Sequence, residues 1–227
     1  DFDLLIITET AQQAGKIESN HQLHQLLMKA IHRTPVSLIA EDIHFVNKRL
    51  NKSQYFYIDI KRQGILLYDS GKFALAEPVE ITPQERKKSA REEFDYWFTS
   101  ANEFYIDYQA CLKRGNLPKA AFELHQATER LYSTVLLVFT RYKPSTHDLA
   151  KLAQRVASAE PQFLTVFPQG SEEERNRFKL LRKAYVDARY KPSYNITKDQ
   201  LEWLAQRVQV LQALTEKLCR AKIAGFG

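Results

Sequence analysis

The pattern of apolar and polar positions changes character near residue 80. Before it, short apolar runs alternate with amphipathic segments, and after it apolar residues recur at the spacing of helices. Residues 74–83, which include Pro78 and Pro83, are interpreted as a linker. The pattern therefore predicts two domains, residues 1–80 and residues 84–223.

The first domain is predicted to be an α/β unit. Buried strands are expected at residues 4–8 and 36–40, a helix at 20–32, and a short helix capped by Asp42. Alternation over residues 55–60 and the apolar run 65–68 predict two more strands on either side of a turn at Gly64. The chain begins without Met, and we expect a strand and a helix of this unit to lie upstream of residue 1.

The second domain is predicted to be an antiparallel bundle of about five helices, which makes the whole chain α+β. The first helix covers residues 84–114 and the second 118–141. The third begins at Thr146, the fourth runs from Ser171 to Tyr190, and Thr197 caps the fifth.

Composition narrows the class of protein. Apolar residues make up 44% of the chain, which is enough for a packed core, and no window resembles a membrane span, so we expect a cytoplasmic protein. The two cysteines, Cys111 and Cys219, are interpreted as reduced core thiols, and no pair of metal ligands has the spacing of a zinc site. A net charge of +6 is compatible with binding of nucleotide or RNA.

The first residues suggest metal chemistry. Asp1 and Asp3 precede the apolar run Leu4–Ile7, and residues two apart share one face of a strand. Two carboxylates on one face are candidate ligands of the Mg²⁺ that nucleoside triphosphate chemistry requires.

Three segments of the second half resemble the HEPN domain, the helical bundle named for nucleotide binding in higher eukaryotes and prokaryotes. They are residues 121–131 (AFELHQATERL), 146–149 (THDL) and 180–190 (LLRKAYVDARY). They occur in the expected order and on the expected helices. The resemblance implies nucleotide binding and a homodimer.

Residues 1–80 resemble the minimal nucleotidyltransferase domain of the polymerase-beta and kanamycin nucleotidyltransferase type, which is often fused to HEPN. The resemblance rests on Asp1-Phe2-Asp3 and its strand, and implies transfer of a nucleoside monophosphate from ATP or another NTP with Mg²⁺. The family's third carboxylate falls at Ser37, which cannot act as an anionic ligand. Glu41 or Asp59 is a candidate replacement.

The HEPN resemblance also leaves a toxin-like ribonuclease open. Some members cleave RNA with an arginine followed, after four to six residues, by a histidine. Arg141 and His147 have that spacing, although Lys143-Pro144 places them across a helix break, and Leu149 stands where the toxin form has a tyrosine. A non-catalytic dimeric nucleotide-binding module is the third alternative.

A nucleotide groove is expected where the second and fourth helices face each other. His125 and Glu129 lie one turn apart on one helix face. A phosphate would pair with Arg189 or Lys191, and a base would stack on Tyr190 or Tyr132. The alternative is a structural hydrogen-bond network of His125, Glu129 and Arg189. Tyr132 and Tyr185 are interpreted as core residues with bonded hydroxyls.

The first helix of the bundle carries more aromatic residues than a monomer's surface usually does. We expect this stripe to extend beyond the domain core and part of it to form a homodimer interface. Its members are Phe94, Trp97, Phe98, Phe104, Tyr105 and Tyr108.

Overall fold

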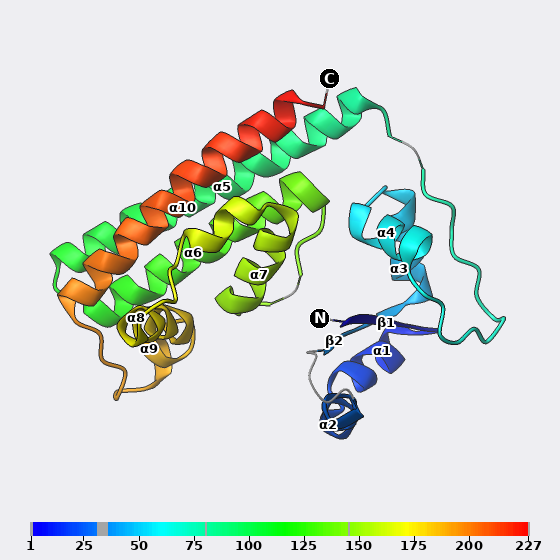
Figure 1. Cartoon of the computed structure of the whole chain (residues 1–227), viewed down its shortest axis with the longest axis horizontal. Helices are drawn as coiled ribbons and strands as arrows, with labels where there is room; N and C mark the ends of the chain where they lie inside the picture. Colours follow the sequence, from blue (N-terminus) through cyan, green and yellow to red (C-terminus); the bar gives the residue numbers. More distant parts are fainter. Residues whose placement is uncertain (1, 31–35, 80, 145, 227) are drawn as a thin grey trace. The chain divides into compact units, whose positions relative to one another are not determined.

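The computed structural model describes residues 2–30, 36–79, 81–144 and 146–226. The chain divides into two compact units, Asp1–Ile81 and Thr82–Gly227. In Figure 1 the first unit is blue to cyan and the second is green to red.

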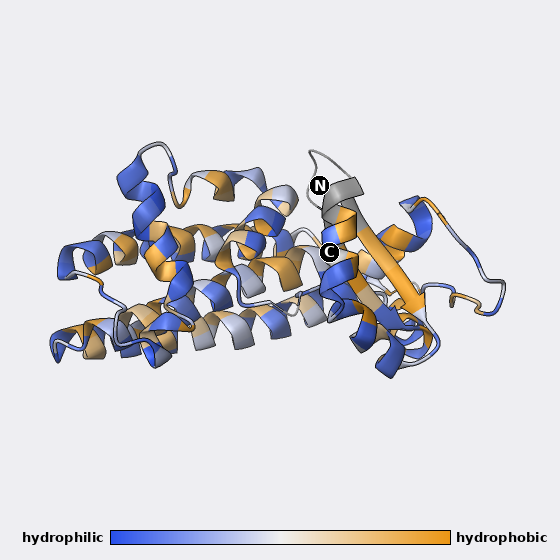
Figure 2. Cartoon of the chain, turned by 90° about the horizontal axis from the view of Figure 1, so that it is seen from below, coloured by the Kyte–Doolittle hydropathy of each residue, from blue (hydrophilic) through white to orange (hydrophobic). Residues whose placement is uncertain are grey.

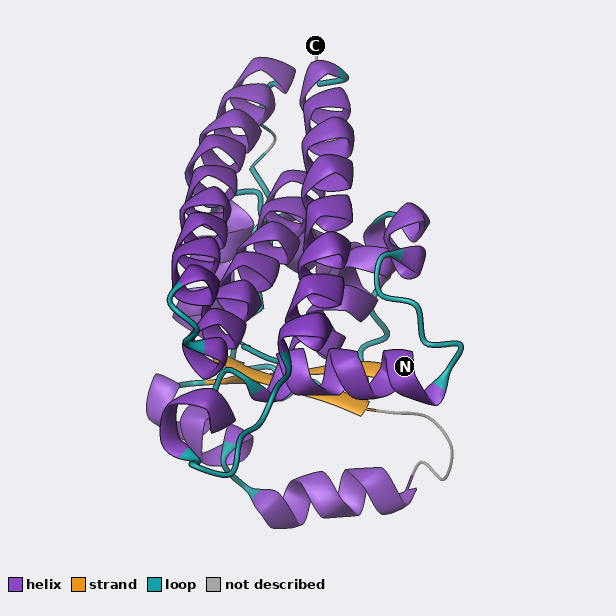
Figure 3. Ribbon diagram, turned by 90° about the vertical axis from the view of Figure 1, so that its left-hand side faces the viewer, coloured by secondary structure: helices purple, strands orange, loops and turns teal. Residues whose placement is uncertain are grey.

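A parallel pair of strands is the centre of the N-terminal unit. β1 (Phe2–Thr8) and β2 (Val36–Asp42) pair in register from Phe2 opposite Val36 to Thr8 opposite Asp42. Both strands are drawn in orange in Figure 3. Parallel neighbours need a crossover connection, and the helices α1 (Ala11–Glu18) and α2 (His21–Ala30) lie in it. The strands predicted near residues 4–8 and 36–40 are therefore confirmed.

The helix α1 was not predicted from the sequence. Its N-terminus is a capping box in which the hydroxyl of Thr10 accepts from the Gln13 amide and the Gln13 side chain accepts from the Thr10 amide. A threonine followed three residues later by glutamine is a known helix start, so this signal was present in the sequence.

Two predicted strands are wrong. Residues 55–60 form part of the helix α4 (Tyr55–Gln63), which follows α3 (Ile43–Asn51). Tyr57 is buried and packs edge-on against Phe45 of α3, so packing between helices outweighs the strand preference of aromatic residues. Residues 65–68 form no strand, and their side chains are 76–86% exposed.

The helical unit contains α5 (Pro83–Lys113), α6 (Leu117–Thr140), α7 (Leu149–Ala159), a 3-10 turn η1 (Pro161–Thr165), α8 (Glu172–Lys183), α9 (Asp187–Tyr190) and α10 (Lys198–Ala224). The five predicted helices are present. However, α7 is capped by Asp148 instead of Thr146, and the fourth predicted helix is divided into α8 and α9. Gly115, at φ +73°, ends the turn after α5, where a backbone that side chains disfavour is needed.

The core of this unit is built around α6, which contacts α5, α7, α8, α9 and α10. Most of its side chains are buried, including polar ones. The other long helices are amphipathic, with alternating hydrophobic and hydrophilic bands in Figure 2. Polar groups inside a core need partners, so the buried polar residues of α6 indicate where a site lies.

The aromatic stripe of α5 lies mostly inside its own domain. Phe94, Phe98 and Tyr108 are 2%, 8% and 2% exposed, and Phe104 and Tyr105 are partly buried against the same core. The expectation that the stripe extends beyond the core is therefore wrong for these residues, because α6 and α10 cover this helix.

Two simpler predictions can be compared directly. Both Cys111 and Cys219 are buried free thiols, as predicted, and burial raises the pKa of Cys219 to about 12. Among the helices that the structure describes, none is long and apolar enough to cross a bilayer.

Candidate functional site

Two buried polar side chains of α6 are the base of the candidate site. His125 is fully buried and Glu129 is 5% exposed, one helical turn later. His125 Nδ1 lies 3.0 Å from the carbonyl oxygen of Leu181. A carbonyl only accepts, so this nitrogen is the protonated donor. His125 Nε2 lies 3.6 Å from Glu129 Oε2, too far for a hydrogen bond, and the two form a charge contact when the ring carries a proton on both nitrogens.

His147 lies on the other side of the Glu129 carboxylate, in the segment that precedes α7. Its Nδ1 is 3.0 Å and 3.1 Å from the two carboxylate oxygens. An ionised carboxylate only accepts, so the proton of a neutral His147 is on Nδ1 and its Nε2 has a free lone pair. The His147 side chain is 52% exposed. Within the described residues no hydrogen bond reaches its Nε2, which is therefore available to a ligand.

The two imidazoles determine the charge of Glu129. Burial alone would raise the pKa of its carboxyl group, but His125 and His147 outweigh burial, and the pKa lies below its usual 4.5. The direct hydrogen bond comes from His147, while His125 acts through its nearby ring nitrogen. Glu129 is therefore a buried carboxylate that remains ionised at neutral pH.

Tyr185 covers the site from the break between α8 and α9. Its ring stacks on His147 with centroids 4.2 Å apart and planes 17° apart, and it lies 5.4 Å from the His125 ring. The Arg189 guanidinium lies 4.4 Å from the Tyr185 ring centroid, and its Nε donates to the Tyr185 carbonyl. The interruption of the predicted continuous helix thus places an aromatic ring on His147 and a cation on that aromatic ring.

Asp148 fixes the segment that contains His147. Its carboxylate accepts from the Ala150 amide at the start of α7. It also accepts two bonds, each 3.2 Å long, from Arg182 of α8. Two consecutive residues therefore attach this segment to α6 and α8. The sequence analysis assigned no site role to Arg182 or Tyr185, although Arg182, Tyr185 and Arg189 are spaced three and four residues apart.

The other residues predicted to line the groove differ in their exposure and in their partners. Tyr190 is 70% exposed, with the Arg189 guanidinium 5.0 Å from its ring. Lys191 pairs with Asp187 at 2.8 Å. Tyr132 is 1% exposed, so its ring offers no face to a base.

Arg141 follows the C-terminal end of α6, whereas His147 bonds Glu129 in the middle of that helix. Arg141 ends α6 in a left-handed conformation, at φ +55°. Twelve residues separate it from Glu129, which is about 18 Å along the helix at 1.5 Å per residue. Since His147 bonds Glu129, the two predicted ribonuclease residues lie near different parts of α6. Burial and the charge of Arg86 lower the pKa of Arg141, while Glu93 acts in the opposite direction.

The predicted metal pair is only partly within the described residues. Asp1 lies outside them, and Asp3 is part of β1 with its Cα opposite that of Ser37. Glu41 is opposite Ile7, four residues and about 13 Å further along β2, and Asp59 belongs to α4. Among the described residues no three His, Cys, Asp or Glu side chains could hold a metal ion together. The Mg²⁺ site at Asp1 and Asp3 therefore stays a prediction.

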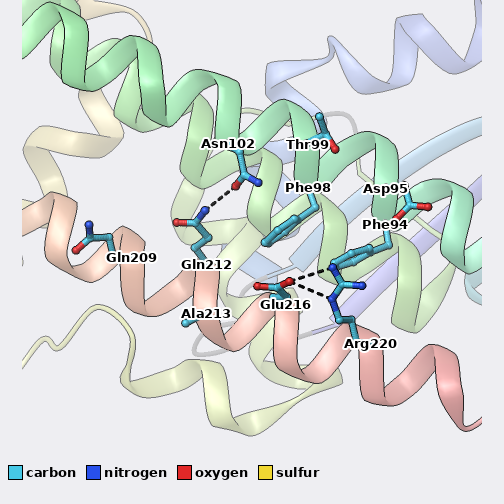
Figure 4. A pocket seen from close by; sticks show the side chains of 10 residues that line it. All are labelled: Phe94, Asp95, Phe98, Thr99, Asn102, Gln209, Gln212, Ala213, Glu216 and Arg220. Carbon is cyan, nitrogen blue, oxygen red and sulfur yellow. Dashed lines mark hydrogen bonds and ion pairs between the residues drawn. The ribbon is translucent and has the colours of Figure 1, made fainter.

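A separate cavity of about 500 Å³ lies between α5 and α10 (Figure 4). Phe94 and Phe98 stack along it, with ring centroids 4.9 Å apart. An Asn102–Gln212 hydrogen bond of 2.6 Å joins the two helices, and Arg220 pairs with Glu216 at 3.0 Å. Because these polar groups already bond one another, this cavity is a weaker ligand site than the one at His147.

A family model described as the HEPN domain matches residues 94–218, more than half of the 227 residues. This span includes His125, Glu129, His147, Tyr185 and Arg189. No curated protein matches the chain.

Proposed function

The chain belongs to the HEPN domain family, and we propose that its helical unit binds a nucleotide at His147, Tyr185 and Arg189, above the buried Glu129. The observation that supports this most is the half-exposed His147, which is bonded by a buried carboxylate and stacked on Tyr185, a ring that Arg189 also contacts. Such a group of one cation, one imidazole and aromatic rings suits a ligand with both a phosphate and a base.

The phosphate end would be bound by Arg189, and His147 would donate to it only when Nε2 also carries a proton, because the lone pair of the neutral ring accepts hydrogen bonds. The guanidinium uses its Nε on the Tyr185 carbonyl, and its terminal N–H groups are the donors left for phosphate oxygens. Lys191 is paired with Asp187 and contributes through its charge alone. The base would stack on Tyr190, whose ring is largely exposed.

Calorimetric titration of the full chain with each of the four ribonucleoside triphosphates tests this proposal. Arg189→Gln and His147→Ala should each weaken binding about tenfold or more, the usual effect of losing one charge-assisted hydrogen bond. Arg175→Gln is the matched control, since Arg175 is an exposed arginine of α8 that bonds carbonyl oxygens. Equal affinities for all four proteins would exclude this site.

Ribonuclease activity is the second candidate, and the state of His147 favours it. A histidine whose Nδ1–H bonds a carboxylate presents Nε2 as a base, which is what attack by a ribose 2′-hydroxyl requires. Arg182 bonds the neighbouring Asp148, and Arg189 contacts the Tyr185 ring on which this histidine stacks. Cleavage of RNA that is lost in His147→Ala but kept in Arg141→Ala would support this arrangement, and absence of cleavage by the unaltered chain would exclude it.

Nucleotidyl transfer by the N-terminal unit stays a prediction. It depends on Asp1 and Asp3, and Ser37 lies opposite Asp3 where an acid was expected. Incubation with labelled ATP and Mg²⁺ tests it, with Asp3→Ala as the variant. Transfer of label that does not respond to Asp3→Ala would show that another site is responsible.

A further inference from the structure

The helical unit has a second group of cations, at the end of the domain where α5 begins and α6 and α10 end. Figure 1 shows the C-terminal end of α10 beside the start of α5. Arg86 of α5 lies 4.3 Å from the Phe226 ring centroid, and Lys222 of α10 lies 5.7 Å from the same ring. Lys222 also lies 5.4 Å from the ring of Phe139, near the end of α6.

The same arrangement continues along α5 at Trp97. Arg130 of α6 lies 4.5 Å from the Trp97 ring centroid, and Lys143 lies 5.4 Å from it. Arg86 and Trp97 are eleven residues apart, close to three turns, so they share a face of α5 and are separated by about 16 Å. We call this surface the basic end: Arg86, Arg130, Lys143 and Lys222 with the rings of Trp97, Phe139 and Phe226.

These four cations differ from many others in the domain. Lys119, Arg177, Arg182, Lys191, Lys198 and Arg220 each pair with a carboxylate. Within the described residues, the cations of the basic end have aromatic neighbours and no carboxylate within ion-pair distance. Glu93, which lies among them, accepts from the indole nitrogen of Trp97 at 3.0 Å and keeps its negative charge. The four cations of the basic end therefore outnumber the acid that lies among them.

We propose that the basic end binds single-stranded nucleic acid. Positive charge alone would attract any polyanion. The aromatic rings favour nucleic acid, because its bases can stack. An arginine over a ring keeps its edge N–H groups for phosphate oxygens, and its outer face is a plane on which a base stacks. Trp97, Phe139 and Phe226 are partly exposed, and each is next to a cation. Alternating rings and cations are the arrangement that single strands need.

Arg141 supports this assignment. It lies close enough to Arg86 and Glu93 for their charges to affect it. Burial and the like charge of Arg86 both lower the pKa of Arg141, and Glu93 opposes them. The effect of Arg86 is expected where cations lie close together. A bound phosphate would remove this repulsion.

Fluorescence anisotropy with a labelled single-stranded RNA tests the proposal on the full chain. Arg86→Gln/Lys222→Gln should weaken binding at least about tenfold. It should also reduce the slope of log K against log salt by about 1.4, since each neutralised phosphate of a single strand contributes about 0.7. Lys151→Gln/Lys179→Gln, which removes two exposed charges from α7 and α8, should change neither value. Equal loss in both double variants would overturn the proposal.

A second comparison separates nucleic acid from an acidic protein. Arg86→Lys keeps the charge but removes the stacking plane, and Phe226→Leu removes a ring. Both should weaken RNA binding and leave binding of polyglutamate unchanged.

The proposal is wrong if polyglutamate binds as tightly as RNA and neither variant affects RNA binding. The basic end would then be a docking surface for acidic protein. Tighter binding of duplex RNA would also contradict the proposal. Because Arg86→Gln/Lys222→Gln should leave the binding of ribonucleoside triphosphates unchanged in calorimetry, failure here is distinguishable from failure of the proposed nucleotide site.

Discussion

The imidazole of His147 stacks on the phenol ring of Tyr185, with centroids 4.2 Å apart and planes 17° apart. One residue precedes α7 and the other follows α8, so this contact joins two segments distant in sequence. The stack leaves His147 only one ring face and its Nε2 edge for a ligand, with Nδ1 bound to Glu129.

Replacement of Tyr185 tests the role of this stack. Tyr185→Leu should weaken nucleotide binding about three- to tenfold, because an aromatic contact of about 0.5–1.5 kcal/mol no longer orients His147. Tyr185→Phe keeps the ring and should bind like the unaltered protein. Calorimetry measures both, and equal loss in the two variants would instead indicate a role for the hydroxyl.

The buried carboxylate predicts how stability depends on pH. The folded-state pKa of Glu129 is depressed, so its contribution is fully present above the unfolded value of about 4.5 and is lost as pH falls through the lower folded value. Glu129→Gln should therefore destabilise the domain by about 1–3 kcal/mol at neutral pH and by progressively less in acid. Urea unfolding at several pH values measures this, with the exposed Glu103→Gln as control. A difference that grows in acid would contradict the assignment.

The two hydrogen bonds between Arg182 and Asp148 should contribute little to the free energy of unfolding. Their main effect should be to hold the segment that contains His147 in place. Both side chains are partly exposed, at 40% and 34%, so a double-mutant cycle should give a coupling of less than about 1 kcal/mol. Arg182→Gln should nevertheless weaken nucleotide binding, because the segment that carries His147 loses its attachment to α8. Unchanged binding would show that the His147–Glu129 bond suffices.

Two leucines of the N-terminal unit test the structure where it differs from prediction. Leu50 is fully buried on α3, whereas Leu66, in the run predicted to be a strand, is 76% exposed. Leu50→Ala should lower the stability of this unit by about 2–5 kcal/mol, and Leu66→Ala should change it by less than about 0.5 kcal/mol. Thermal unfolding followed by circular dichroism compares them. A large loss for Leu66→Ala would mean that residues 65–68 are buried after all.

The thiols give a simple chemical test. Only the thiolate reacts with alkylating or disulfide reagents, and burial raises the pKa of Cys219 to about 12. Neither Cys219 nor the buried Cys111 should react in the native protein at pH 8, and both should react in denaturant. Rapid labelling of Cys219 without denaturant would contradict the packing of α10.

The regular apolar patterns of the helical unit were enough to predict its helices. The short apolar runs of the N-terminal unit were not enough to distinguish helix from strand. The stripes of α5, α6 and α10 are many turns long, and the caps Ser171 and Thr197 mark the starts of α8 and α10. The run 55–60 alternates like a strand, but the contact of Tyr57 with Phe45 decides its structure, and a contact between distant residues is not visible in a local pattern.

Only part of the candidate site could be predicted from the sequence. His125 and Glu129 were found together because helical spacing places them on one face. The partner of Glu129, His147, was singled out for a different pairing, with Arg141. Its actual neighbours depend on how the segment before α7 folds back, and on the break that separates α8 from α9. Neither event has a periodic signature, so Tyr185 and Arg182 became visible only in the structure.

The central position of α6 has a consequence for folding. Every other α-helix of its unit contacts it, so no pair of neighbouring helices can be removed to leave an intact smaller core. The unit should consequently lose its structure in one cooperative transition, with the backbone amides in the middle of α6 exchanging with solvent only through complete unfolding. His125 and Glu129 are within this slowest-exchanging segment, so the base of the site persists for as long as the domain remains folded.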